Sequence, residues 1–405
     1  MGRDKLISAA VQVGAIVLSG FSLSRAIAAE TPPSFEVYGF GQSDYIQDIR
    51  RVDPNWEDTL RPSKIPTAAG EYGSDGQASI SVKQSRLGVK GSMPVDGNDL
   101  FTKIEFDFFG VGADAGQTTI RLRHAYGQWG EWLGGQTNSL FMDGDVFPNV
   151  IDYWGPAGMV FLRTPQIRWT PFQGDYELAF AIEKPDLGID VGNIRYEDPK
   201  LGANIQNDLK APDLTGQFRA NRPWGHVQLA GILRRVGYDT VGNSTNDPKD
   251  HLIGWGFDLT SNIKTIGQDK VDLGAVYGKA IAAYMNDGGV DLAPQGVPGS
   301  LQAETVPLWG IVAYYDRYWN DHFSTSVGYS RTQVSNRSFQ AGDAFHSGEY
   351  ASINLLYTPV KNVLMGAEYL WGRRVDNNFN SGDDTRTQVT FKYSFSSKDV
   401  LGNRI

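Results

Sequence analysis

The sequence predicts an all-β protein, a transmembrane antiparallel β-barrel of about 16 strands. Three observations lead to this fold class. The chain begins with an export signal, apolar and polar residues alternate in many short runs, and the links between these runs alternate between short and long. After the signal, no run of 18 apolar residues occurs that could form a spanning helix. A closed barrel is then the remaining way to cross a bilayer.

The N-terminus has the plan of a secretory signal peptide. Arg3 and Lys5 precede an apolar run over 6–23, and Ala26-Ile27-Ala28 provides a small-residue cleavage site. The alternative, an uncleaved anchor helix, fits less well because the run is short and contains polar residues. The predicted organisation is a signal peptide over 1–29, a β-barrel over 30–395 and a C-terminal tail over 396–405.

The amino-acid composition limits which partners the protein can bind and which kinds of bond can stabilise it. The chain has no cysteine, so a disulfide framework is impossible, and its formal net charge of −9 disfavours nucleic acid as a partner. It contains 10 Trp, 18 Tyr and 20 Phe, yet its mean hydropathy is slightly polar, at −0.34. This combination is typical of a barrel with aromatic girdles and a wet interior. A soluble β-rich carbohydrate-binding protein would share it.

Alternation of apolar and polar residues marks the strands. Near the C-terminus, Val389, Phe391 and Tyr393 alternate with Thr390 and Lys392. The same alternation recurs over 101–108, 253–259 and 324–330. A period of two places each set on one face of a strand. The pattern alone leaves open whether the apolar face points into the barrel or out of it.

The links decide between a membrane barrel and a soluble sandwich. Seven short and eight long links follow strictly in turn, the last long one over 375–385. Tight periplasmic turns at one rim and long outer loops at the other are the plan of outer-membrane barrels, and sixteen strands leave an aqueous lumen. We expect strands to start near Phe35, Ile80, Leu100, Thr118, Trp132, Gln166, Tyr176, Leu214, Trp224, Leu252, Lys270, Val306, His322, Glu349, Asn362 and Arg386.

The third long link, over 138–165, interrupts the series of strands. It is rich in Gly, Pro and Asp but also in large apolar residues. A loop this long in a compact protein is usually functional or disordered, and its aromatic content argues against disorder. We expect it to fold into the lumen and narrow it; the alternative is an Ω-loop on a soluble sandwich. The expected constriction residues are Asp143, Asp145, Phe147, Asp152, Tyr153 and Trp154.

Several runs in and after this link carry a family resemblance. They are Phe147-Pro148-Asn149, Asp152-Tyr153-Trp154-Gly155-Pro156 and Arg163-Thr164-Pro165-Gln166-Ile167-Arg168, together with Val37-Tyr38-Gly39-Phe40 at the start of the barrel. In these runs the chain resembles the DcaP-like porins. The resemblance extends over essentially the whole mature chain. The resemblance implies a homotrimeric outer-membrane porin of Gram-negative bacteria, surrounded by lipid and lipopolysaccharide. It also implies passive uptake of small organic anions, especially dicarboxylates. One departure is the tail that follows Phe395, where many barrels end.

Basic residues on the polar faces of strands are candidates for contact with an anionic solute. A charge that faces lipid at the bilayer midplane costs about 2–4 kcal/mol, so most must face the lumen or lie near a rim. Arg121 and Arg123 share one face, and guanidinium groups match the geometry of carboxylates. The alternative is that they only pair with wall carboxylates such as Glu105 and Asp107. The pore-lining candidates are Arg86, Lys103, Arg121, Arg123, Arg168, Arg219 and Arg331.

Other activities fit less well. Asp143, Asp145 and Asp152 offer oxygen ligands for calcium, but their spacing matches no established motif, and capping or pairing with arginine is expected instead. The five histidines are scattered, and no nucleophile with a histidine partner is evident. We therefore expect no enzyme activity, no metal and no cofactor.

Two other kinds of barrel stay open at this point. A general or sugar-type diffusion porin would show an aromatic slide along the lumen, which Tyr153, Trp154 and Phe161 permit. A surface adhesin or receptor would use the long links over 47–79 and 184–213 as binding surfaces.

Overall fold

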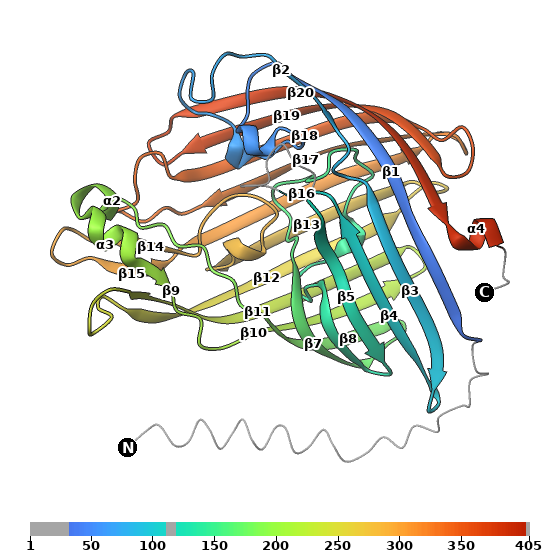
Figure 1. Cartoon of the computed structure of the whole chain (residues 1–405), viewed down its shortest axis with the longest axis horizontal. Coiled ribbons are helices and arrows are strands. Elements are labelled where there is room, and N and C mark those ends of the chain that lie inside the picture. Colours follow the sequence, from blue (N-terminus) through green and yellow to red (C-terminus); the bar gives the residue numbers. More distant parts are fainter. Residues whose placement is uncertain (1–31, 111–118, 402–405) are drawn as a thin grey trace.

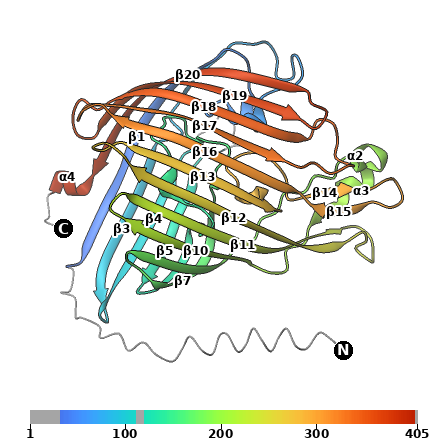
Figure 2. The same ribbon diagram turned by 180° about the vertical axis from the view of Figure 1, so that it is seen from behind.

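Sixteen strands of the described chain close into one antiparallel barrel (Figures 1 and 2). The computed structural model describes residues 32–110 and 119–401, so the expected signal peptide over 1–29 lies outside them. The barrel strands are β1 (Ser34–Asp48), β2 (Gln77–Ser81) continued by β3 (Arg86–Val95), β4 (Asn98–Asp107), β5 (Arg121–Trp129), β6 (Trp132–Asn138), β7 (Arg163–Phe172), β8 (Tyr176–Glu183), β10 (Asp213–Arg222), β11 (Gly225–Thr240), β12 (Asp250–Lys264), β13 (Lys270–Lys279), β16 (Pro307–Tyr318), β17 (Phe323–Val334), β18 (Phe345–Tyr357), β19 (Val363–Asp376) and β20 (Ser381–Ser396).

The first strand closes the barrel. β1 pairs with the last strand, β20, from Tyr38 opposite Ser396 to Asp48 opposite Arg386. Its other edge pairs with β3 and then with β2. Closure gives every described barrel strand a neighbour on both sides, which is how a sheet satisfies its backbone in a bilayer. The predicted fold class is confirmed.

Apolar side chains point out of the barrel and polar ones point in. On β20, Val389, Phe391 and Tyr393 are exposed, whereas Gln388 and Thr390 are buried. This arrangement is the reverse of a soluble barrel and matches an outer-membrane barrel with a polar interior. No helix in the described part of the chain is long and apolar enough to cross a membrane.

The last predicted long link is wrong. β19 continues to Asp376 and β20 already begins at Ser381, which leaves only the tight turn 377–380. The predicted link falls largely on strand residues, since Val375 and Ser381 are already paired strand positions. The expected link over 111–117 and the strand start near Thr118 lie outside the described residues.

The C-terminal tail contacts the first strand. After β20, the short helix α4 (Ser397–Leu401) begins, and the Ser397 hydroxyl accepts a hydrogen bond from the backbone N–H of Val37 at 3.1 Å. Asp399 pairs with Lys361 at 2.6 Å in the turn before β19. The start of β1 and the end of β20 therefore lie at the rim that carries the short turns (Figure 1).

Four long links carry the remaining elements. They contain the 3₁₀ turns η1 (Pro54–Trp56), η2 (Pro62–Lys64), η4 (Gly144–Val146) and η5 (Ala282–Tyr284), the helices α2 (Ile194–Glu197) and α3 (Pro199–Asn204), and the strands β9 (Ile205–Asn207), β14 (Leu292–Gln295) and β15 (Gln302–Thr305). Three of these links, over 49–76, 139–162 and 280–306, pack together in apolar clusters. In one cluster Leu60 and Ile65 meet Val146 and Met159.

Candidate functional site

The third link, residues 139–162, crosses the interior of the barrel. Tyr153 donates a hydrogen bond to Asp107 of β4 at 2.6 Å. The backbone N–H of Asn149 donates to Asp316 of β16 at 3.1 Å, and that of Ile151 donates to Glu368 of β19 at 2.9 Å. Because β4 and β16 lie on opposite sides of the closed barrel, these bonds hold the link across the lumen.

A buried carboxylate fixes the centre of this link. Asp152 accepts hydrogen bonds from the Thr59 hydroxyl at 2.9 Å, the Leu60 backbone at 3.0 Å and the Gly155 backbone at 3.1 Å. Burial raises the pKa of the Asp152 carboxyl above its ordinary value, although Arg386 and the backbone donors oppose this shift. Asp152 thus joins the third link to the first one, and it also belongs to the lining of the cavity on the short-turn side.

The other two aspartates of the link are capped or paired. Asp143 accepts from the Asp145 backbone at 3.0 Å and so caps η4. Burial opposes ionisation of Asp143, but hydrogen bonds from His226 and Thr260 outweigh it and hold the pKa of this carboxyl below its ordinary value. Arg219 of β10 bonds to Asp145 at 2.5 Å. Asp143, Asp145 and His226 bring ligand atoms within 4.8 Å of one another, but the Arg219 guanidinium already supplies the cation.

Arg121 and Arg123 converge on the wall beside Tyr153. Arg121 makes a fork to Asp107 at 3.0 and 2.8 Å. Arg123 donates to Glu105 at 2.8 Å and to Asp107 at 2.9 Å. The Tyr153 hydroxyl accepts from Arg123 at 2.8 Å and also contacts Arg121. Both arginines therefore reach the third link, and both carry carboxylate partners.

Two cavities meet at the third link. The one on the side of the short turns has a volume of about 370 Å³, and the one on the side of the long links has a volume of about 300 Å³. Tyr153, Phe161 and Arg163 line both of them. These three side chains consequently form the neck between the two cavities.

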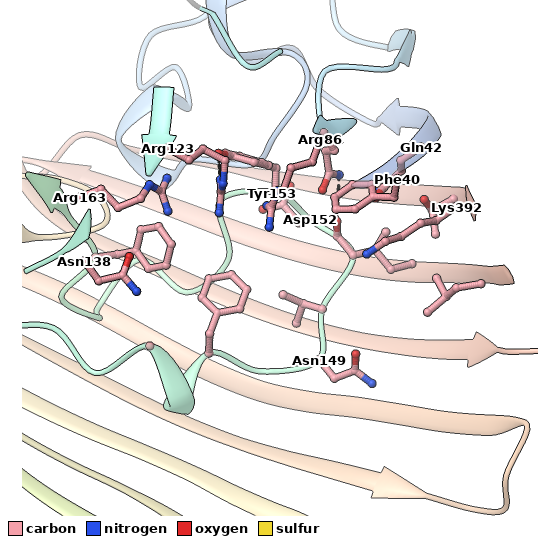
Figure 3. Close-up of a pocket in the computed structure, with 18 of the residues that line it drawn as sticks. Phe40, Gln42, Arg86, Arg123, Asn138, Asn149, Asp152, Tyr153, Arg163 and Lys392 are labelled. Carbon is pink, nitrogen blue, oxygen red and sulfur yellow. Dashed lines mark hydrogen bonds between the residues drawn. The ribbon is translucent and has the colours of Figure 1, made fainter. Parts of the chain in front are cut away.

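Four basic side chains follow one another along the first cavity. In Figure 3, Arg163 and Lys392 lie at opposite ends of the labelled side chains, with Arg123 and Arg86 between them. Arg86 lies 3.6 Å from Glu105, which Lys103 also approaches, at 3.2 Å. The wall is thus basic along its length, but its middle section is partly neutralised.

The two outer members of this series, Arg163 and Lys392, were missed by the sequence analysis. Within residues 32–110 and 119–401, no carboxylate oxygen lies within 4.0 Å of either side chain. Instead, Arg163 lies 5.1 Å from the ring centre of Phe161, and Lys392 lies 4.0 Å from that of Phe40. Arg163 directly follows the third link, and Lys392 is on the polar face of an alternating strand. These two signals were available in the sequence.

Arg168 and Arg331 lie away from this site. Arg168 points inward on β7, but it bonds to Gln166 at 3.0 Å and to the Asn138 carbonyl at 2.7 Å and lines neither cavity. Arg331 is wrong as a pore-lining candidate. Its neighbours Ser330 and Thr332 are fully buried on the inner face, so the period of two directs Arg331 outward. Both faces of β17 are polar near the rim, so the sequence pattern does not indicate whether the Arg331 side chain points inward or outward.

The remaining constriction candidates are aromatic and pack between links. Trp154 meets the Trp56 ring edge-on with centres 4.9 Å apart, and the Arg61 guanidinium lies 4.1 and 4.4 Å from these two ring centres. Phe147 packs against Phe161 at 5.5 Å between ring centres. Rings from two links thus flank the neck.

Comparison with known proteins assigns the chain to a family. The family model described as DcaP outer membrane protein matches residues 61–395. The chain belongs to the DcaP family. This membership and the porin fold place it in the bacterial outer membrane as a channel protein. No curated protein sequence matches it.

Solved structures of outer-membrane proteins share the fold of this chain. The crystal structure of the outer membrane channel DcaP of Acinetobacter baumannii aligns with a TM-score of 0.75 and 24% identity, over 93% of this chain and 100% of that one. An anion-selective porin from Comamonas acidovorans aligns with a TM-score of 0.58 and 10% identity, over 90% and 100%. OmpT of Vibrio cholerae in a trimer form aligns with a TM-score of 0.52 and 12% identity, over 90% and 100%.

Proposed function

We propose that this DcaP-family channel takes up small organic anions, dicarboxylates in particular, by passive diffusion. The observation that carries the proposal is a pair of basic side chains in the cavity beside the neck, Arg163 and Lys392, which have no carboxylate partner among residues 32–110 and 119–401. The resemblance of the third link to the DcaP-like porins supports the same class of solute. So does the fold shared with a porin described as anion-selective.

The net charge of the protein does not decide its selectivity. At physiological salt, exposed charges are screened beyond about 8–10 Å, so the acidic outer links act weakly on an ion in the neck. Local charges in a narrow, low-dielectric passage set the barrier instead. Asp107 and Glu105 largely offset Arg121 and Arg123. Arg86 and Lys103 share Glu105 with Arg123, so this section keeps part of its positive charge. Arg163 and Lys392 add two cations that have no carboxylate oxygen within 4.0 Å in the described residues.

The positions of these cations suit a solute with two carboxylates. Arg163 lines both cavities, so a solute that enters from the long-link side meets it before and after the neck. A fork of guanidinium donors binds one carboxylate, while a second carboxylate can reach the next cation in the series. Release requires weak binding, which corresponds to millimolar affinity or roughly −4 kcal/mol.

Planar bilayers test this function. In a potassium chloride gradient the reversal potential should show preference for chloride, and succinate or phthalate should block the current transiently. Arg163→Gln and Lys392→Gln should each reduce the chloride preference and shorten the block. Arg168→Gln is the matched control, because this arginine points inward but lines neither cavity. A wild-type channel that prefers potassium and ignores dicarboxylates would show that the proposal is wrong.

A sugar-type diffusion porin is the second candidate. The aromatic rings of Tyr153, Phe161 and Trp154 around the neck favour it, since aromatic faces pack against sugar rings. Liposome swelling separates the two readings: faster swelling with neutral sugars than with dicarboxylates of similar size favours the sugar porin. An adhesin is less consistent with the fold, because Val52, Leu60 and Ile65 bury the first link among the other links.

We also propose that the channel works as a homotrimer. The family resemblance supports this, and one structurally similar outer membrane protein was solved in a trimer form. Closed cyclic symmetry lets each subunit bury one patch of its wall. Light scattering in mild detergent should give three times the mass of one chain, and a monomer mass would contradict the proposal.

A further inference from the structure

A row of charged residues crosses the outer face of four neighbouring strands. Arg331 of β17 is paired in register with Glu349 of β18, which is paired with Arg373 of β19, which is paired with Asp383 of β20. Their chain neighbours Thr332, Tyr350 and Asp384 are fully buried inside the barrel. The row therefore points away from the lumen, on the wall that Figure 2 shows from outside.

The row lies at the upper edge of the apolar band. On β17, β18 and β19, the residue two positions from the row on the side away from the long links points outward as well. These residues are Tyr329, Ala351 and Trp371, which are paired with one another. Two positions further along the same strands are Val327, Ile353 and Tyr369, which are exposed and face lipid. A charge on the lipid face costs about 2–4 kcal/mol at the midplane but close to nothing at the interface. The row consequently marks the headgroup level of the outer leaflet.

The two arginines of the row are not saturated by protein partners. Arg331 donates a hydrogen bond to Gln333 at 2.9 Å, lies 3.8 Å from Glu349, beyond hydrogen-bond distance, and keeps its side chain 35% exposed. Arg373 is exposed and donates a hydrogen bond to the Ser381 hydroxyl at 3.4 Å. Within the described residues, no carboxylate oxygen lies within 4.0 Å of Arg373. Asp383, by contrast, is engaged by Arg50 at 3.3 Å.

We propose that this outward row is a binding site for the phosphorylated headgroup of lipopolysaccharide. Arg331 and Arg373 would hold its phosphate groups, because guanidinium forks match phosphate oxygens. The Trp309 ring lies 5.7 Å from Arg331 on the long-link side of the row, opposite Gln333, and Trp371 lies on its membrane side. The row is thus flanked by two Trp rings, the residue type of the aromatic belts at membrane interfaces. Basic clusters beside a membrane span recognise anionic lipid in the same way.

A second copy of the chain fits this surface less well. The core of a subunit interface is depleted in charged residues and enriched in apolar ones. Here the four charges of the row sum to zero, and Arg50, which pairs with Asp383, leaves the whole group with an excess of one positive charge. An anion at headgroup depth neutralises this excess. The inference is independent of the solute that the channel conducts.

Binding of lipid A to the purified channel in detergent tests the site. Native mass spectrometry or thermal unfolding would compare the wild type with the double variant Arg331→Gln and Arg373→Gln. Each lost charge-assisted contact should weaken binding roughly tenfold, which corresponds to about 1.4 kcal/mol. Lipid A without its phosphates should bind the wild type no better than the double variant. The conductance should stay unchanged, since both residues lie outside the lumen.

The matched control is Arg317→Gln. Arg317 also points outward, lies 5.1 Å from the ring centre of Trp319 and pairs with Asp269 at 2.5 Å, but it belongs to the rim with the short turns. This variant should bind lipid A like the wild type. Glu349→Gln should bind lipid A more tightly than the wild type, because it removes the carboxylate that competes with the phosphate for the two arginines. This variant keeps the test valid if the double variant folds poorly.

Two results would overturn the proposal. One is equal lipid A binding by the wild type, the double variant, Arg317→Gln and Glu349→Gln. The other is a loss of oligomers by the double variant in detergent that contains no lipid A. That result would assign the row to a contact between copies of the chain.

Discussion

Tyr153 of the third link and Asp107 of β4 share a hydrogen bond of 2.6 Å. The same carboxylate pairs with Arg121 and Arg123, so a single acidic group joins the loop to the basic wall. The position of the loop and the charge of the neck are therefore coupled. A change on either side of this bond should alter both the width of the passage and its selectivity.

Tyr153→Phe should loosen the third link without removing its ring. The variant loses a hydrogen bond to a charged group, worth about 1.5–3 kcal/mol, while the stack on Phe109 at 3.9 Å remains. We expect larger current fluctuations and a higher mean conductance in single-channel recordings. Tyr126→Phe is the control, since this wall tyrosine lies on β5 outside both cavities. Identical recordings for wild type and Tyr153→Phe would show that the bond does not hold the loop.

Arg123→Ser should lower both stability and anion selectivity. Arg123 is nearly buried beside Glu105 and Asp107, and breaking a buried ion pair from one side costs about 3–5 kcal/mol. The remaining carboxylates would also attract cations into the neck. The temperature at which the folded barrel unfolds on a gel should fall, and the reversal potential should move toward potassium. Arg163→Gln should shift the reversal potential without lowering the unfolding temperature, because no carboxylate oxygen of the described residues lies within 4.0 Å of this side chain.

Arg61→Ala should widen the cavity on the long-link side. Arg61 bonds to Asp287 at 2.9 and 2.7 Å and stacks between Trp56 and Trp154. The loss frees the first link from the link over 280–306, so larger neutral solutes should pass in liposome swelling. Arg195→Ala removes a comparable but more exposed pair with Asp190 and should leave swelling unchanged. Equal solute cut-offs for all three proteins would contradict a role of Arg61 in holding the links.

Epitope tags test the orientation of the barrel. The turn at Asp96 and Gly97, which both have positive φ, joins β3 to β4 at the rim with the short turns. The link over 241–249 lies at the opposite rim. A tag within 243–247 should be labelled on intact cells, whereas a tag at Asp96 should be labelled only after the outer membrane is opened. Labelling at Asp96 on intact cells would reverse the topology.

The sequence by itself determined the class of fold and the position of its strands. Alternation depends only on neighbouring residues, and the need to satisfy every backbone group in a bilayer allows few other solutions. The run from Asp143 to Trp154 was also recognisable, because its glycine, its proline and its aromatic rings are local features of the sequence. Local pattern failed at the rims, where polar residues occupy both faces of long strands, as for Arg331 and for the turn 377–380.

Only the tertiary structure decided which charges are free. Arg123 and Arg163 look alike in the sequence, yet one is paired with Glu105 and Asp107 and the other faces Phe161 without a carboxylate. Ion pairing depends on the register between strands and on links that meet across the barrel, such as Arg61 with Asp287, 226 residues apart. No local periodicity encodes such contacts, because closure of the barrel brings them together.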